Sequence, residues 1–170
     1  MGMQPLVGYN FGAGKMDRVF RTLKYAAIGG AAITTTGFLL SQIIPAYIVR
    51  LFTTDEELLM ISTRGLQIIT AVFPLVGAQV VITNFFQSVG KAKISVFLSL
   101  TRQLIFLLPF LLLLPPVFGL DGVFGSLPAA DVVAFVVTFF TFIHQTKKME
   151  KEYGIKVLSK TKADKKSDDK

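Results

Sequence analysis

Side chains that could carry out covalent or metal-based chemistry are scarce in this sequence. There is no Cys, and His144 is the single His. Thiolate nucleophiles, thiolate zinc sites and His-rich metal clusters are therefore excluded. We expect no catalytic residue, no metal site and no enzymatic activity, which leaves polar groups in apolar surroundings as the candidates for function.

A glycine-rich segment, GYNFGAGK at residues 8–15, invites comparison with phosphate-binding loops. Its spacing does not fit that class of site. Tyr9 stands where a Walker loop has its first Gly, and Met16 stands where the loop has Ser or Thr after its Lys. We interpret the segment as the end of a helix, with Gly8 and Gly12 leaving room for a close helix neighbour.

A stripe of polar side chains interrupts one of the apolar stretches. Gln79, Thr83 and Gln87 recur every four residues, with Asn84 beside them. This spacing places the three on one face of a helix. Polar side chains in lipid need partners within the protein. The stripe therefore either hydrogen-bonds neighbouring helices or lines a cavity and binds a substrate there, and the sequence leaves both interpretations open.

Two charged residues also lie deep inside apolar stretches. Asp131 is an ionisable group at a depth that favours a functional role, such as accepting a proton or a cation. The competing interpretation is that Asp131 caps a helix that begins after Pro128. For Arg102 we expect a structural role, in which the side chain extends toward the cytoplasmic surface or bonds the carbonyls of a helix end.

The composition and the long uncharged stretches indicate a helical membrane protein. Hydrophobic residues make up 52% of the chain and its mean hydropathy is +0.58, more than a small soluble domain can bury. Residues 25–49 and 65–90 carry no charge, and each run exceeds the roughly 20 residues that cross a bilayer as a helix. Two further apolar runs follow at residues 103–120 and, apart from Asp131, at residues 122–146.

We therefore predict an all-α fold, a polytopic transmembrane helical bundle with four complete spans and a partial helix at the N-terminus. The predicted spans cover about residues 22–47, 57–88, 94–116 and 121–146. Kinks are expected at the prolines inside these spans, Pro74, Pro109 and Pro128. The third span should end at Pro115, Pro116 and Gly119.

Polar residues mark the expected starts of two spans. Thr54 and Glu57 have the spacing of a capping box, which predicts that the second span begins there. Asp121 is expected to cap the fourth span. Arg64 then lies about two turns into the second span, where we expect it to pair with Glu57 or Glu56.

Basic residues are concentrated in alternate loops. Four bases precede the first span and two follow the second, whereas Arg50 alone follows the first; nine of the 18 bases lie in the last 24 residues. The positive-inside rule then places both chain ends in the cytoplasm. We expect a multi-pass protein of the inner (plasma) membrane. Residues 151–170 are expected to form a disordered basic tail that meets anionic lipid and binds no nucleic acid.

Three stretches resemble the multidrug and toxic compound extrusion (MATE) family. The first, QPLVGYNFGAGKMDRVFRTLK at residues 4–24, resembles the segment that ends the second helix of the C-terminal six-helix lobe and leads to the third. The others, FFQSVGKAKISVFLSLTRQLIFLLPFLLLLP at residues 85–115 and FGLDGVFGSLPAADVVAF at residues 118–135, are similar to the last two helices and the turn between them. The resemblance covers roughly residues 1–150, as a partial C-terminal lobe.

This resemblance implies a secondary antiporter that exports cationic or amphipathic drugs in exchange for Na⁺ or H⁺, by alternating access between two lobes. The chain would supply helices nine to twelve and the end of helix eight. Its partners would be the lipid bilayer, the drugs, and either the missing transporter helices or another copy of the chain. The alternative is a truncated, non-transporting membrane protein or helix-interaction module, which the start MGMQPL inside an expected helix favours.

Overall fold

The computed structural model of the protein describes residues 2–153, and these residues form helices without any strand. The elements in chain order are α1 (Met3–Gly12), α2 (Met16–Ile43), α3 (Pro45–Arg50), α4 (Glu56–Thr70), α5 (Phe73–Ser88), α6 (Ala92–Leu100), the π-helix η1 (Thr101–Leu107), α7 (Leu108–Leu113) and α8 (Pro115–Tyr153). The predicted all-α class is confirmed. Of the predicted tail, residues 151–153 end α8 and the rest lies outside the described residues.

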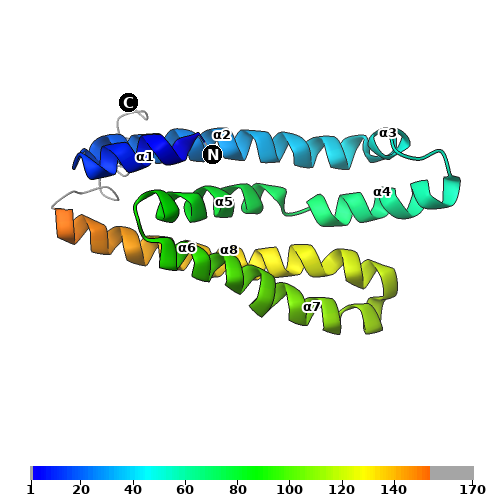
Figure 1. The fold of residues 1–170 in the computed structure, drawn as a ribbon. Helices are drawn as coiled ribbons and strands as arrows, with labels where there is room; N and C mark the ends of the chain where they lie inside the picture. Colours follow the sequence, from blue (N-terminus) through cyan, green and yellow to red (C-terminus); the bar gives the residue numbers. More distant parts are fainter. Residues whose placement is uncertain (1, 154–170) are drawn as a thin grey trace, which may run out of the picture.

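The helices form an elongated bundle of antiparallel passes (Figure 1). On one side, α1 lies beside the first half of α2; α4 and α5 form the middle; α6, η1 and α7 lie against α8 on the other side. The central helix α5 contacts α1, α2, α6 and α8. Its side chains therefore face protein on several sides, which makes α5 the element that can position an internal site.

The bundle contains helices long and apolar enough to cross a membrane. Three single passes qualify in the described chain, namely α2, the continuous run Ala92–Leu113 and α8. A fourth qualifies when α4 and α5 count as one span, which is bent by 50° between them. These helices overlap the four predicted spans, whose number and bounds stay predictions. α2 begins before the first uncharged run and ends at Ile43, before that run does, whereas α8 extends beyond the last uncharged run at both ends.

The bend between α4 and α5 originates at Pro74. A proline lacks the backbone N–H, and its ring clashes with the carbonyl four residues earlier. Here that carbonyl belongs to Thr70, the last residue of α4. The next helix begins at Phe73 with Pro74 in its first turn. The kink predicted at Pro74 is confirmed.

The other two prolines are accommodated differently. Pro109 lies in the first turn of α7, directly after the π-helix η1, and the run Ala92–Leu113 remains one pass. Pro128 lies inside α8, where the residue with non-helical backbone angles is Gly119. The helix therefore continues through Pro128, and the kink predicted at this proline stays a prediction.

Gly119 makes the turn between the third and fourth passes. Its φ of 58° lies in the left-handed region, which glycine adopts at no steric cost. Gly122 then comes so close to Leu114 that a Cβ atom would collide with the backbone carbonyl. The predicted turn at Pro115, Pro116 and Gly119 is confirmed, and it holds α7 tightly against α8.

Arg64 pairs with Asp121 rather than with Glu56 or Glu57. Its Nη2 donates to Asp121 Oδ2 at 2.5 Å. The reason is that α4 packs along α8, which brings Asp121 to Arg64 from a distant part of the sequence. The two side chains are 70% and 40% exposed, so the pair contributes little to stability. Asp121, the predicted cap, is thus an ion-pair partner.

Asp55 rather than Thr54 caps α4. Its Oδ1 accepts hydrogen bonds from the backbone N–H groups of Glu57, at 2.9 Å, and Leu58, at 3.0 Å. A carboxylate at this position satisfies two free N–H groups and is stabilised by the positive end of the helix dipole. The predicted start of the helix is confirmed, and the capping residue is corrected.

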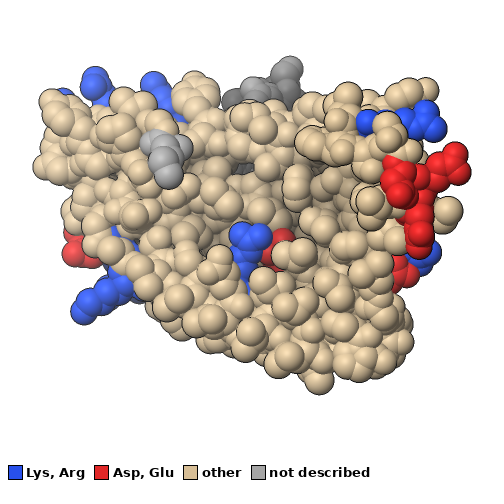
Figure 2. Space-filling model, turned by 45° about the vertical axis from the view of Figure 1, so that its right-hand side comes forward, with Lys and Arg blue, Asp and Glu red and all other residues tan. Residues whose placement is uncertain are grey.

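The buried core lies at the end of the bundle where α5 turns into α6. Its largest buried side chains are Phe85, Phe86, Leu98, Met149, Val7 and Val19. In the turn, Lys91 donates from Nζ to Gln145 Oε1 at 3.1 Å, and partial burial lowers the pKa of its ammonium group. Charged residues gather at the two ends of the molecule and leave a mostly uncharged face between them (Figure 2).

Small residues allow α2 and α5 to approach closely. A Cβ atom on Gly77 would lie 2.7 Å from Thr34 Cγ2, and a Cβ atom on Gly30 would lie 3.0 Å from Val81 Cγ2. Glycines at such positions let the backbones of membrane helices pack closely. Gly77 therefore sets the distance between α2 and the central helix.

We predict that Gly77→Ala destabilises the protein by about 1–3 kcal/mol, because the added methyl group forces Thr34 and the backbones apart. Gly29→Ala is the matched control, since nothing lies within 4 Å of a Cβ atom there. The control should be neutral or stabilising by about 0.5–1 kcal/mol. Unfolding of the purified chain by titration with a denaturing detergent measures both, and equal midpoints for the two variants would refute the close approach.

A second prediction concerns the start of α4. Asp55→Ala should reduce the free energy of unfolding by about 1 kcal/mol because two N–H groups lose their acceptor. Thr54→Ala should leave it unchanged, since Asp55 accepts both bonds. The same detergent titration distinguishes the two variants, and a larger loss in Thr54→Ala would restore the capping box as the correct description.

Candidate functional site

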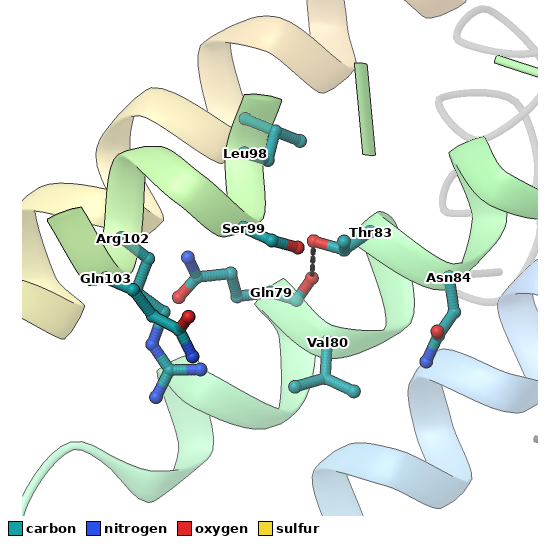
Figure 3. Close-up of a pocket in the computed structure, with 8 residues that line it drawn as sticks. All are labelled: Gln79, Val80, Thr83, Asn84, Leu98, Ser99, Arg102 and Gln103. Carbon is teal, nitrogen blue, oxygen red and sulfur yellow. Dashed lines mark hydrogen bonds between the residues drawn. The ribbon is translucent and has the colours of Figure 1, made fainter. Parts of the chain in front are cut away.

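A cavity of about 220 Å³ lies between α5 and the run formed by α6 and η1. The residues that line it are Gln79, Val80, Thr83, Asn84, Leu98, Ser99, Arg102 and Gln103 (Figure 3). Except for Val80 and Leu98, these side chains are polar. Polar groups that converge between apolar membrane helices mark ligand pathways and binding sites. This cavity is therefore the candidate functional site.

Two members of the polar stripe, Gln79 and Thr83, face the cavity. The Thr83 hydroxyl donates to the Gln79 backbone carbonyl at 2.9 Å, one turn earlier on α5. The Gln79 side chain extends toward Arg102 and Gln103 (Figure 3). Gln79 is 3% exposed, and its Oε1 accepts no hydrogen bond within the described part of the chain. An unpaired buried polar atom costs about 1–3 kcal/mol, so this oxygen is a ready acceptor for a ligand or a water.

Asn84 and Gln87 contact the N-terminal helix. Gln4 of α1 donates from Nε2 to Gln87 Oε1 at 3.1 Å and to Asn84 Oδ1 at 3.4 Å. Asn84 also lines the cavity, whereas Gln87 is exposed and lies outside it. The two interpretations, bonding to a neighbouring helix and lining a cavity, thus each apply to part of the stripe. Gln87 bonds the neighbouring helix α1, and Gln79, Thr83 and Asn84 line the cavity. Contact with a substrate stays a prediction.

An ion pair lies beside the cavity, and its arginine lines the cavity. Arg102 Nε donates to Asp131 Oδ1 at 2.6 Å, and the two side chains are 32% and 9% exposed. Figure 2 shows one blue and red group midway between the charged ends of the visible face. Asp131 lies inside the continuous part of α8, so the interpretation as a helix cap is wrong. Arg102 likewise bonds a carboxylate and not the carbonyls of a helix end.

The π-helix η1 positions Arg102 between two cavities. The second cavity, of about 160 Å³, is lined by Arg102, Gln103, Leu107, Leu127, Ala130 and Asp131. A π-helical turn contains an extra residue and redirects the side chains that follow, and such turns are frequent at functional sites. Arg102 therefore has Asp131 on one side and the cavity with Gln79 on the other.

The sequence contains a signal for this ion pair in the spacing of its two charges. Arg102 precedes Pro116 by 14 residues, and Asp131 follows it by 15. Residues equally far from the turn of an antiparallel helical hairpin lie at the same depth. Since the turn at Pro115 and Pro116 was predictable, two opposite charges placed evenly about it pointed to each other.

The side chains at the cavity are suited to binding a ligand through hydrogen bonds. Its side chains are amides, hydroxyls and a guanidinium group, which donate and accept hydrogen bonds. Between residues 2 and 153, no three His, Cys, Asp or Glu side chains lie close enough together to hold a metal ion. The site is therefore suited to recognise polar groups of an organic ligand.

The family model and the relatives that match this sequence indicate the same family. The MatE family model matches residues 1–114. The multidrug export protein MepA of Staphylococcus haemolyticus (strain JCSC1435) is 28% identical over 142 residues, which are 83% of this chain and 31% of that protein. MepA of Staphylococcus aureus (strain N315) is 28% identical over 130 residues, 76% of this chain and 28% of that protein. The chain spans about a third of the length of these relatives.

Solved structures of transporters share the arrangement of helices. The MATE multidrug transporter DinF-BH in complex with rhodamine 6G superposes with a TM-score of 0.77 at 36% identity, over 91% of this chain and 34% of that chain. A mutant of the Vibrio cholerae MATE transporter VcmN gives a TM-score of 0.80 at 18% identity, over 90% of this chain and 35% of that chain. The second likeness supports the fold alone.

The family match covers most of the chain, and the helical architecture is that of an integral membrane protein. The matched residues 1–114 are about two thirds of the 170-residue sequence and include the polar stripe and Arg102. The helices around them are apolar and long enough to cross a bilayer, as in an integral membrane protein. This chain belongs to the MatE family.

Proposed function

We propose that the chain forms the last four helices of the C-terminal lobe of a multidrug efflux transporter, and that its polar cavity contacts the transported drug. The relatives named as multidrug export proteins and the transporter structure in complex with rhodamine 6G support this proposal. The observation that carries it is the cavity beside the central helix, with the unpaired Gln79 Oε1 next to the Arg102–Asp131 pair. Binding sites at mid-membrane are what alternating access requires.

The proposed transport is export of amphipathic or cationic drugs in exchange for Na⁺ or H⁺. Asp131 is the proposed site for the coupling ion or proton in this part of the protein. Its carboxylate is 9% exposed and lies inside a membrane pass, where an ionisable group is costly unless it has a function or a partner. The Arg102 guanidinium supplies the partner in the absence of the ion.

The proposed location is the inner (plasma) membrane with both chain ends in the cytoplasm. The bases in the first turns of α2 and those that follow α5 lie at the same end of the bundle, as the antiparallel passes require. The outer face of α2 is apolar, with Ile33 76% and Ile43 73% exposed. This face is suited to contact lipid, the remaining transporter helices or another copy of the chain.

The polar stripe provides a test of this proposal. In cells that lack their own drug pumps, expression of the chain should lower retention of rhodamine 6G. Gln79→Ala should reduce the rate of export about tenfold, because one hydrogen bond to the dye is lost. Gln87→Ala is the matched control: it lies two turns away on α5, outside the cavity, and should export at the wild-type rate.

Membrane abundance of each variant, measured by immunoblot, makes the rates comparable. Dye retention equal to that of cells with an empty vector, at matched abundance, would contradict transport by this chain. That result would favour the alternative of a non-transporting membrane protein that associates with other helices. A defect of equal size in Gln79→Ala and Gln87→Ala would contradict the role of the cavity.

A further inference from the structure

The Arg102 guanidinium uses one of its donor atoms. Its Nε bonds Asp131, whereas neither Nη atom donates to an acceptor within residues 2–153. The side chain lies beside Gln103 and opposite Gln79 at the cavity (Figure 3). A guanidinium group presents donors in a planar fork that matches the two oxygens of a carboxylate. The unused side of this fork faces the space that a ligand would occupy.

The other polar groups around the cavity can add hydrogen bonds to a group held by Arg102. Gln79, Asn84 and Gln103 have amide donors, and Ser99 has a hydroxyl. Arg102 is the charged residue among the described lining of this cavity, because Asp131 lines the second cavity instead. These amides and the hydroxyl also accept hydrogen bonds, as Gln79 Oε1 can. The preference for an oxygen anion therefore comes from the unused Nη donors of Arg102, since charge-assisted hydrogen bonds are stronger than neutral ones.

We propose that this cavity is a subsite for the carboxylate group of an amphipathic compound, bound by Arg102 and supported by the amide nitrogen of Gln79. The inference rests on the proposed function and specifies the substrate class of the same site. Asp131 is a positioning residue that fixes the guanidinium and balances its charge when the subsite is empty. A carboxylate adds a negative charge, so the preferred ligand carries its own positive charge elsewhere in the molecule.

The dimensions of the cavity agree with a subsite for one functional group. At about 220 Å³ it is smaller than typical cavities for whole drug-sized ligands, about 300–1,000 Å³. It has room for a carboxylate and the ring that carries it. The remainder of the ligand then lies against the surfaces that complete the transporter.

A matched pair of dyes tests the inference. Rhodamine 6G is a cationic ethyl ester, and its free acid differs by carrying a carboxylate in place of the ester. Fluorescence anisotropy with the full 170-residue chain in lipid nanodiscs gives the two dissociation constants. We expect the acid to bind about tenfold more tightly than the ester, because the Arg102 fork bonds its carboxylate.

The variant Arg102→Gln/Asp131→Asn removes both charges together, so no unpaired charge is left to disrupt folding. It should bring the ratio of the two dissociation constants to about one. Arg64→Gln/Asp121→Asn is the matched control, because it removes the other ion pair, far from the cavity, and should keep the tenfold preference. Circular dichroism and size-exclusion chromatography confirm that each variant is folded.

The results separate this inference from the proposed function. The subsite would be refuted if the wild-type chain and Arg102→Gln/Asp131→Asn preferred the acid over the ester by the same factor. It would also be refuted if the wild-type chain bound the ester as tightly as the acid, or bound neither dye. Export of rhodamine 6G by cells together with no preference for the acid leaves the proposed function standing and the subsite refuted. Preference for the acid without export refutes transport by this chain and supports the subsite.

Discussion

A polar group inside a bilayer must find its partner within the protein, since the hydrocarbon offers neither donors nor acceptors. The Arg102–Asp131 pair meets this requirement across the hairpin formed by the third and fourth passes. The turn at Gly119 determines which residues face each other across that hairpin. The pair in turn fixes the guanidinium at the edge of the cavity, so the turn, the register of two helices and the site depend on one another.

Departures from regular α-helix occur where polar groups need room. The break before Pro74 ends α4 at Thr70, and Thr70 accepts a hydrogen bond of 2.6 Å from Ser41 on α2. The π-helix η1 carries Arg102. The helix α5 begins directly after the first of these segments, remains regular, and presents Gln79 to the cavity between itself and the run of α6 and η1. Proline and π-helical turns are thus the means by which an apolar bundle accommodates a polar interior.

Features governed by local chemistry could be predicted from the sequence. The long uncharged runs, the bend at Pro74 and the turn at Gly119 follow from hydropathy and from the geometry of proline and glycine. Contacts between helices were harder to predict, because a single sequence shows the face of a helix and not its neighbour. The contacts of Arg64 with Asp121 and of Gln87 with Gln4 were not predicted for this reason. The residue types of η1 also gave no sign of a π-helix.

The central claim is that the cavity beside α5 faces the transported compound, and the absence of cysteine from the chain permits a direct test. Ser99→Cys places a thiol at the cavity, and Lys93→Cys places one outside it on the same helix. The rate of modification by a small water-soluble thiosulfonate is measured with and without rhodamine 6G. With dye at about ten times its Kd, modification at Ser99→Cys should slow about tenfold and that at Lys93→Cys should not change. Equal rates with and without dye at Ser99→Cys would contradict the claim.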